Sequence, residues 1–188
     1  MRALGSVLAI LLVVLTLFVP AEAVETGRFG FGINYGTLNN FRVWNSASTE
    51  SGGVLIVSYV YDFNDFYTTA LELGFFADNN VLKDDTFAGT GSYLNIDHIF
   101  HTRKIGQFSP YVKFGTGIYS SDLWRKQNGS FGFNASSVIA DLSAGVGADF
   151  ELWKALVNVD LFFPALFRLA IFGQKLPYVL SLGSKYYF

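Results

Sequence analysis

Apolar and polar positions alternate with a period of two along most of the chain, a pattern typical of β-strands that have one apolar face. In residues 29–36, large apolar side chains occupy every second position, and glycine or asparagine occupies the positions between them. A helix would scatter the same apolar residues around its circumference. The alternation recurs in five further segments: 67–75, 112–118, 141–150, 157–163 and 178–188.

Two more segments complete a set of eight predicted strands. In residues 91–100 the pattern favours aliphatic and aromatic side chains on one face and Asn95 and Asp97 on the other, but it leaves the facing of this strand open. Residues 53–61 carry apolar side chains on both faces, so the pattern leaves their facing open.

The two faces of the predicted strands differ in kind. One is large and aromatic, whereas the other carries glycine, serine and too few charges for a surface in water. This contrast indicates that the aromatic face contacts lipid and the small polar face lines an interior. Because backbone polar groups in hydrocarbon must be paired, such strands close into a barrel. We therefore predict an all-β fold, an eight-stranded antiparallel up-and-down transmembrane barrel. A soluble ligand-binding barrel is the alternative, and failure to extract the protein without detergent would exclude it.

Residues 1–23 have the pattern of a secretory signal peptide. Arg2 is followed by an uncharged apolar run over 3–19 and a small-x-small cleavage site that ends at Ala23. A single membrane anchor is the alternative, but the run is short of the roughly 20 residues that a spanning helix needs. Cleavage after Ala23 would leave residues 24–188 as one barrel domain.

The predicted connections alternate between long and short, as they do in outer-membrane barrels with short periplasmic turns and long outer loops. The long ones are 38–52, 77–86, 120–135 and 164–176. The short ones are 62–65, 101–107 and 152–154. Both ends of the barrel then lie in the periplasm, and aromatic residues from Tyr59 to Tyr67, with Trp153, form the periplasmic girdle. At ~10 residues per strand the chain is too short for a sixteen-stranded porin.

Composition excludes several classes of function. The chain has no cysteine, which removes disulfides, zinc-thiolate sites and thiol nucleophiles. The formal net charge is -2, whereas a nucleic-acid-binding protein usually carries an excess of basic residues. The only histidines, His98 and His101, are three apart, so they point to opposite faces of a strand and cannot jointly bind a metal. The nearest serines in sequence are Ser92 and Ser109, and neither adjoins a histidine. We predict no catalytic residue, no cofactor site and no metal site.

Charged residues at interior positions should form a plug. An eight-stranded barrel is just wide enough for side chains to fill it, so opposite charges inside should pair. Interior glycines should leave room for large neighbours such as Tyr111, Tyr119 and Tyr187. A path for ions or protons is the alternative reading of the same charges. The predicted interior network is Glu72, Asp97, Lys113, Asp141, Asp149, Asp160 and Lys185.

Four segments carry a resemblance to a known family: GFGINYG at 30–36, SPYVKFGTG at 109–117, GVGAD at 145–149 and KYYF at 185–188. With the signal peptide, they resemble the OmpA-like and OmpX-like small outer-membrane barrels of Gram-negative bacteria. The resemblance implies a bacterial outer-membrane location. It also implies that Tyr186 and Phe188 belong to a C-terminal signal read by the barrel-assembly machinery. A peptidoglycan-binding domain is not expected after Phe188.

The predicted outer loops hold the candidates for contact with partners. In the third loop, Trp124, Arg125 and Lys126 suit lipopolysaccharide phosphates or a protein. In the fourth, Phe167 and Arg168 belong to an apolar stretch that fits the outer lipid boundary, or else a hydrophobic ligand. We expect a non-enzymatic monomer in the outer membrane that contacts lipopolysaccharide or a surface ligand through its loops. The alternative is a narrow channel or lateral route for small hydrophobic molecules.

Overall fold

The structure is a computed structural model that describes residues 27–41, 50–78, 87–102, 104–127, 130–152, 155–164 and 177–188. The predicted signal peptide and its cleavage site lie outside the described residues. Trp153, Phe167 and Arg168 lie outside them as well.

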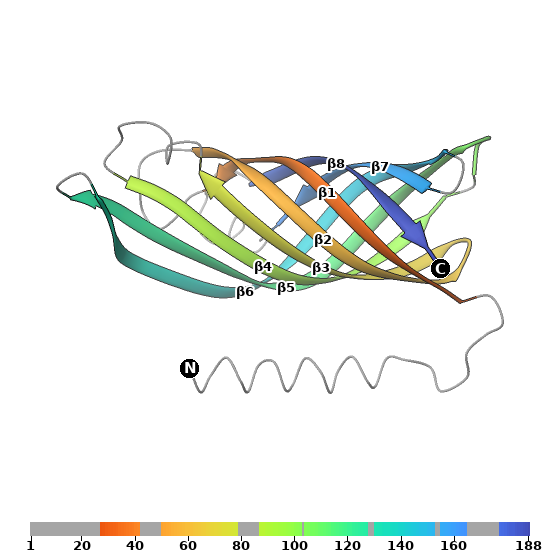
Figure 1. The fold of residues 1–188 in the computed structure, drawn as a ribbon. Helices are drawn as coiled ribbons and strands as arrows, with labels where there is room; N and C mark the ends of the chain where they lie inside the picture. Colours follow the sequence, from red (N-terminus) through yellow and green to blue (C-terminus); the bar gives the residue numbers. More distant parts are fainter. Residues whose placement is uncertain are drawn as a thin grey trace.

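Eight antiparallel strands form a closed barrel, in which each strand pairs with the next and β1 pairs with β8 (Figure 1). The fold class predicted from the alternation is therefore confirmed. No helix among the described residues is long and apolar enough to cross a membrane. The strands are β1 (Arg28–Phe41), β2 (Glu50–Asn64), β3 (Tyr67–Asp78), β4 (Phe87–His101), β5 (Phe108–Gln127), β6 (Ser130–Leu152), β7 (Ala155–Phe163) and β8 (Tyr178–Tyr187).

The three connections predicted to be short lie at one end of the barrel, which we call the turn end. The start of β1 and the end of β8 lie there, together with the ends of β2, β4 and β6 and the starts of β3, β5 and β7. This arrangement confirms the predicted phase of the chain. We call the opposite end the loop end.

The prediction of a third long loop at 120–135 is wrong. Strand β5 runs to Gln127 and β6 begins at Ser130, so a two-residue link joins two long strands. Their pairing continues from Phe108 to Gln127, and the resulting hairpin extends beyond the other strands in Figure 1. The sequence carried a signal for this: Asn128-Gly129 is the dipeptide that two-residue hairpin turns favour.

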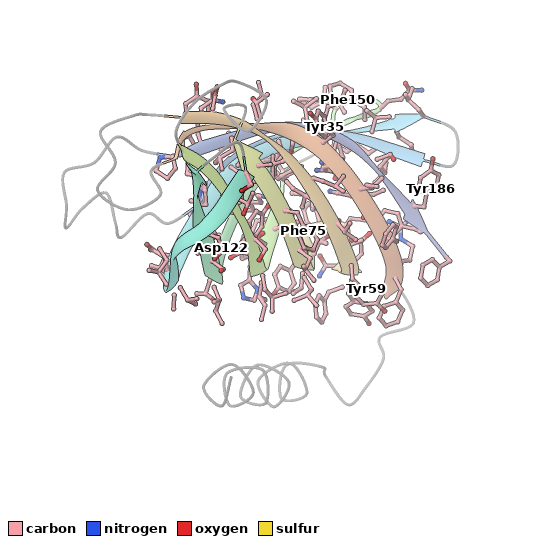
Figure 2. The ribbon with its side chains drawn as sticks, turned by 60° about the vertical axis from the view of Figure 1, so that its left-hand side comes forward. Tyr35, Tyr59, Phe75, Asp122, Phe150 and Tyr186 are labelled. Atoms are coloured by element: carbon pink, nitrogen blue, oxygen red, sulfur yellow. The ribbon has the colours of Figure 1, made fainter. Side chains whose placement is uncertain are left out.

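Large apolar side chains face outward, as the alternation predicts. Tyr35 and Phe75 are more than half exposed, and both lie among the projecting side chains of Figure 2. The facing of 53–61 is also settled: Leu55 and Tyr59 point outward, whereas Val54 and its inward neighbours are buried. A belt of exposed aromatic and aliphatic residues around a closed barrel is the exterior that lipid requires.

Aromatic rings form a continuous chain around the turn end. The ring of Phe29 lies 4.6 Å from that of Tyr61, which lies 4.6 Å from Phe63, and Phe63 is 5.0 Å from Tyr67. Tyr67 in turn stacks on Phe100 at 5.3 Å. Rings with a polar tip favour the membrane interface, and this chain includes Tyr61, Phe63 and Tyr67 of the predicted girdle.

Interior glycines accommodate large neighbouring rings. A Cβ built on Gly74 would lie 2.0 Å from the ring of Tyr93, and one on Gly147 would lie 2.4 Å from the ring of Tyr111. Gly30 leaves similar room for Tyr187. Tyr119 instead places its ring 5.7 Å from that of Tyr93. These glycines leave space beside the inner wall that the aromatic rings occupy.

Candidate functional site

The middle of the lumen is built around one lysine, Lys113 of β5. Its ammonium Nζ lies 2.6 Å from Asp160 Oδ2, 3.3 Å from Glu72 Oε1 and 3.9 Å from Asp97 Oδ2. The lysine stem lies against Gly145, whose Cβ would fall 3.0 Å from Lys113 Cγ and Cε. Lys113 is 1% exposed. Strands β3, β4, β5 and β7 thus converge on one buried cation, and we call these four residues the middle layer.

Neutral polar groups hold one of these carboxylates in place. Asn95 Nδ2 donates to Asp97 Oδ1 at 2.6 Å and to Ser143 Oγ at 3.0 Å. Tyr119 donates its hydroxyl hydrogen to Asn95 Oδ1 at 3.3 Å. The contacts bridge β4, β5 and β6, so the middle layer is fixed by hydrogen bonds as well as by charge.

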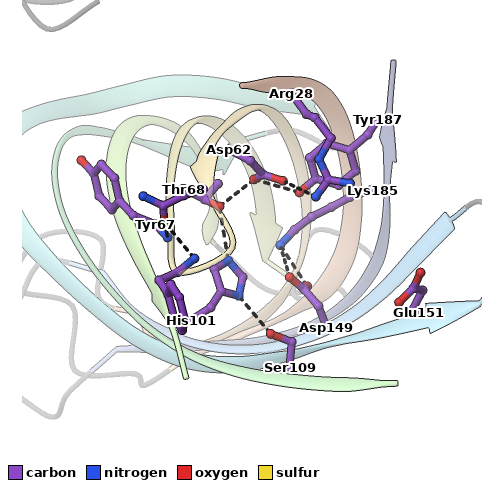
Figure 3. Close-up of polar contacts among 12 residues, drawn as sticks. Arg28, Asp62, Tyr67, Thr68, His101, Ser109, Asp149, Glu151, Lys185 and Tyr187 are labelled. Atoms are coloured by element: carbon purple, nitrogen blue, oxygen red, sulfur yellow. Dashed lines mark hydrogen bonds and ion pairs between the residues drawn. The ribbon is translucent and has the colours of Figure 1, made fainter. Parts of the chain in front are cut away.

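A second polar layer lies near the turn end and is shown in Figure 3. Lys185 Nζ donates to both carboxylate oxygens of Asp149, at 3.0 and 3.1 Å. Asp62 accepts hydrogen bonds from Thr68 Oγ1 at 2.6 Å and Tyr187 Oη at 3.3 Å, and its Oδ2 pairs with Arg28 at 3.2 Å. We call this group, with its acids Asp62 and Asp149 and its bases Arg28 and Lys185, the turn-end layer.

Six of the seven predicted interior charges are buried in these two layers. The seventh, Asp141, is less buried. Asp141 is partly exposed, and its Oδ1 accepts a hydrogen bond from the Leu142 backbone N–H at 2.7 Å. The interior acid that the prediction missed is Asp62, which was assigned to a turn. Strand β2 continues to Asn64, so Asp62 keeps the inward phase of Ser58. The period of two, extended by one more step, would have found it.

The loop-end half of the lumen is apolar, which corrects the expectation of an interior that is polar throughout. Phe162 joins the two regions, because its ring lies 5.9 Å from that of Tyr93 and 4.4 Å from Lys113 Nζ. We call this cluster the apolar layer. Its members are Leu38, Val54, Ile56, Phe76, Tyr93, Tyr119, Phe162 and Val179, each no more than 8% exposed.

The two histidines face opposite sides of the barrel wall, as their spacing predicts. His98 lies outside, where its Nδ1 is 2.8 Å from the Tyr67 hydroxyl, and His101 lies inside, with Nε2 3.3 Å from Thr68 Oγ1. The inference that no serine neighbours a histidine holds along the sequence but is wrong for the folded barrel. Pairing of β4 with β5 brings Ser109 Oγ to 3.4 Å from His101 Nδ1. Among the described residues, no group of three or more histidine, aspartate and glutamate side chains could hold a metal.

The predicted loop-contact residues and assembly-signal residues lie in different parts of the barrel. Trp124, Arg125 and Lys126 belong to β5 rather than to a loop, in the part of the hairpin nearest its tip; their side chains lie outside the described part of the structure. Tyr186 and Phe188 are exposed on the outer surface at the turn end, where the Phe188 N–H donates to the carbonyl of Phe29 at 3.0 Å.

Comparison with known proteins shows similarity in structure rather than in sequence. No protein-family model matches the chain, and no curated protein matches it. Neisserial surface protein A (NspA) has a TM-score of 0.62 at 13% identity, covering 87% of this chain and 100% of its own. Ail, the attachment invasion locus protein of Yersinia pestis, has a TM-score of 0.59 at 14% identity. The match covers 86% of this chain and 99% of Ail.

A third solved structure agrees with these two. The N-terminal β-barrel domain of Pseudomonas aeruginosa OprF has a TM-score of 0.55 at 17% identity, covering 87% of this chain and 100% of its own. At such identities the similarity shows the fold. That fold is the small barrel of bacterial outer-membrane proteins, the family resemblance and the location predicted from the sequence.

Proposed function

We propose that this protein is a non-enzymatic barrel of the bacterial outer membrane that acts through surface contacts at its loop end. The observation that carries the proposal is the filled lumen. Charged side chains close its middle and turn end, and the apolar layer closes its other half. Because the interior is occupied by side chains, a lipid or protein partner would have to bind outside it.

The long hairpin of β5 and β6 supports a surface role. Residues 130–143 of β6 continue past the last pair with β7, Ala144 with Phe163, and pair with β5 among the described residues. The hairpin therefore extends past the closed barrel wall (Figure 1). NspA is named as a surface protein and Ail as an attachment and invasion protein, so two barrels of the same fold have names consistent with this role.

Lipopolysaccharide is the partner that the hairpin composition favours. Arg125 and Lys126 lie next to Trp124 near the tip, and basic residues beside an anionic lipid surface contribute about 1 kcal/mol each. We further propose that the chain is a monomer. Its exposed C-terminal residues Tyr186 and Phe188 would present the signal read by the barrel-assembly machinery.

An enzymatic role is disfavoured by where the histidine–serine pair among the described residues lies. His101 and Ser109 face the lumen beside Thr68 and Asp62, on the inner side of the wall (Figure 3). Both ring nitrogens of His101 already face hydroxyl groups, of Thr68 and of Ser109. A lipid-modifying enzyme would need its nucleophile on the outward face, within reach of an acyl chain.

A narrow channel for small hydrophobic molecules is the second candidate, and the apolar layer is the observation in its favour. Conductance in a planar bilayer separates the two functions. We expect the refolded wild type to be silent, and Glu72→Ala to stay silent, because the apolar layer still closes the loop-end half. Reproducible wild-type conductance would contradict the proposal and favour a channel.

The surface role has its own test. We expect Arg125→Ala combined with Lys126→Ala to weaken binding of lipopolysaccharide micelles to the detergent-solubilised barrel by about thirtyfold at low salt. Arg28→Ala, which removes one positive charge at the turn end, is the control and should leave binding unchanged. Equal loss in both variants would show that binding follows net charge rather than the hairpin.

A further inference from the structure

The excess negative charge of the barrel interior is concentrated in one layer. In the turn-end layer the two acids are matched by two bases, Arg28 and Lys185. In the middle layer three carboxylates face the single ammonium of Lys113. All three carboxylates share this one ammonium, so acidic side chains outnumber basic ones by two at the level where Asp97 and Asp160 are no more than 2% exposed. A buried charge of this kind requires compensation.

Oxygen atoms without a hydrogen-bond partner gather at the same level. They include Asp160 Oδ1, Asn158 Oδ1, Ser181 Oγ and Asn34 Oδ1, none of which has a partner among the described residues. The four side chains are all at least nine-tenths buried. A buried acceptor left unsatisfied costs about 1–3 kcal/mol, and three of these four oxygens can only accept.

The strand register places these four residues in one patch of the inner wall. Asp160 of β7 pairs with Ser181 of β8, and Asn158 pairs with Gly183. On its other side Gly183 pairs with Asn34 of β1, so the two asparagines flank one glycine. A Cβ on Gly183 would lie 1.9 Å from Asn34 Oδ1, so this amide oxygen lies directly over the glycine. Directly paired residues have Cβ atoms about 4.5–5.5 Å apart.

The geometry points to a binding site for a monovalent alkali-metal cation, lined by Asp160, Asn158, Ser181 and Asn34. One carboxylate and three neutral oxygens can replace the hydration shell of such an ion, as carbonyl oxygens do in cation-selective filters. The cation would contact Asp160 Oδ1, the oxygen of that carboxylate that does not face Lys113, and would satisfy several unpaired acceptors at once while lowering the net negative charge of the layer. A divalent ion held by converging carboxylates does not fit, because no described group of three acidic or histidine side chains could hold a metal.

Thermal unfolding of the refolded full barrel in zwitterionic detergent tests the site, in sodium, potassium or choline chloride at equal ionic strength. A ligand that binds the folded state stabilises it, so we expect sodium or potassium to raise the unfolding midpoint above that in choline by roughly 2–4 °C. Choline is too large to be coordinated by this patch. Equal midpoints for wild type in all three salts would overturn the proposal and leave water as the partner of these oxygens.

Variants locate the effect. Asn158→Ala removes one ligand, and Gly183→Ala displaces Asn34 Oδ1, so both should abolish the difference between sodium or potassium and choline. Asp149→Asn is the matched control, because it alters a buried carboxylate of the turn-end layer and should lower the midpoint equally in every salt. A difference between salts that survives in both Asn158→Ala and Gly183→Ala would place the cation elsewhere and overturn the site. The wild-type comparison decides the question even where a variant does not refold.

Discussion

Replacing Lys113 with methionine should lower the free energy of unfolding of the barrel by about 3–5 kcal/mol, because removal of one partner leaves buried charge uncompensated. Lys113 is the single base beside Glu72, Asp97 and Asp160 in the middle layer. Methionine keeps an apolar stem of similar length over Gly145, so the loss reports charge more than packing. Urea unfolding followed by tryptophan fluorescence in detergent measures the change.

Two further variants test that explanation. Lys104→Met removes an exposed lysine that pairs with Glu151 at the turn end, and we expect no measurable change. Adding Asp160→Asn to Lys113→Met should recover part of the lost stability, since it removes one of the uncompensated carboxylates. A Lys113→Met protein as stable as wild type would mean that the three carboxylates are neutralised without the lysine.

The sequence predicted the barrel well because each strand needs only local information. The period of two gives the face of every residue, and it placed Lys113, Asp160 and Lys185 inside without any knowledge of neighbouring strands. Which of them meet depends on register, which is a property of pairs of strands. The contact of Lys113 with Asp160 crosses β6 and could not be derived from either strand alone.

The errors have the same origin. In 53–61 both faces are apolar, so the pattern could not show that Val54 and Ile56 belong to an apolar layer inside the barrel. That layer forms because residues from seven strands meet at one level. His101 and Ser109 are eight apart in sequence and become neighbours through the pairing of β4 with β5. Loop length was overestimated where polar residues continue a strand, as in the β5 and β6 hairpin.

The apolar layer gives the second large effect, which we expect from Phe162→Ala. Phe162 is fully buried in the lumen and touches both the ring of Tyr93 and the ammonium of Lys113. Truncation of a buried phenylalanine to alanine costs about 3–5 kcal/mol, from lost burial and the cavity that remains. The cavity would lie between the apolar and middle layers, so Phe162→Ala combined with Glu72→Ala should conduct ions where wild type does not.

Phe163 provides a control of the same residue type on the same strand. It is the next residue of β7 and faces outward, so Phe163→Ala removes the same atoms from the lipid side of the wall. We expect Phe163→Ala with Glu72→Ala to remain silent in a planar bilayer and to lose less stability than the Phe162 variant. If the two double variants conduct equally, the lumen is not what closes the barrel, and the proposed surface function loses its main support. If the Phe162 double variant alone conducts, the apolar layer is the seal.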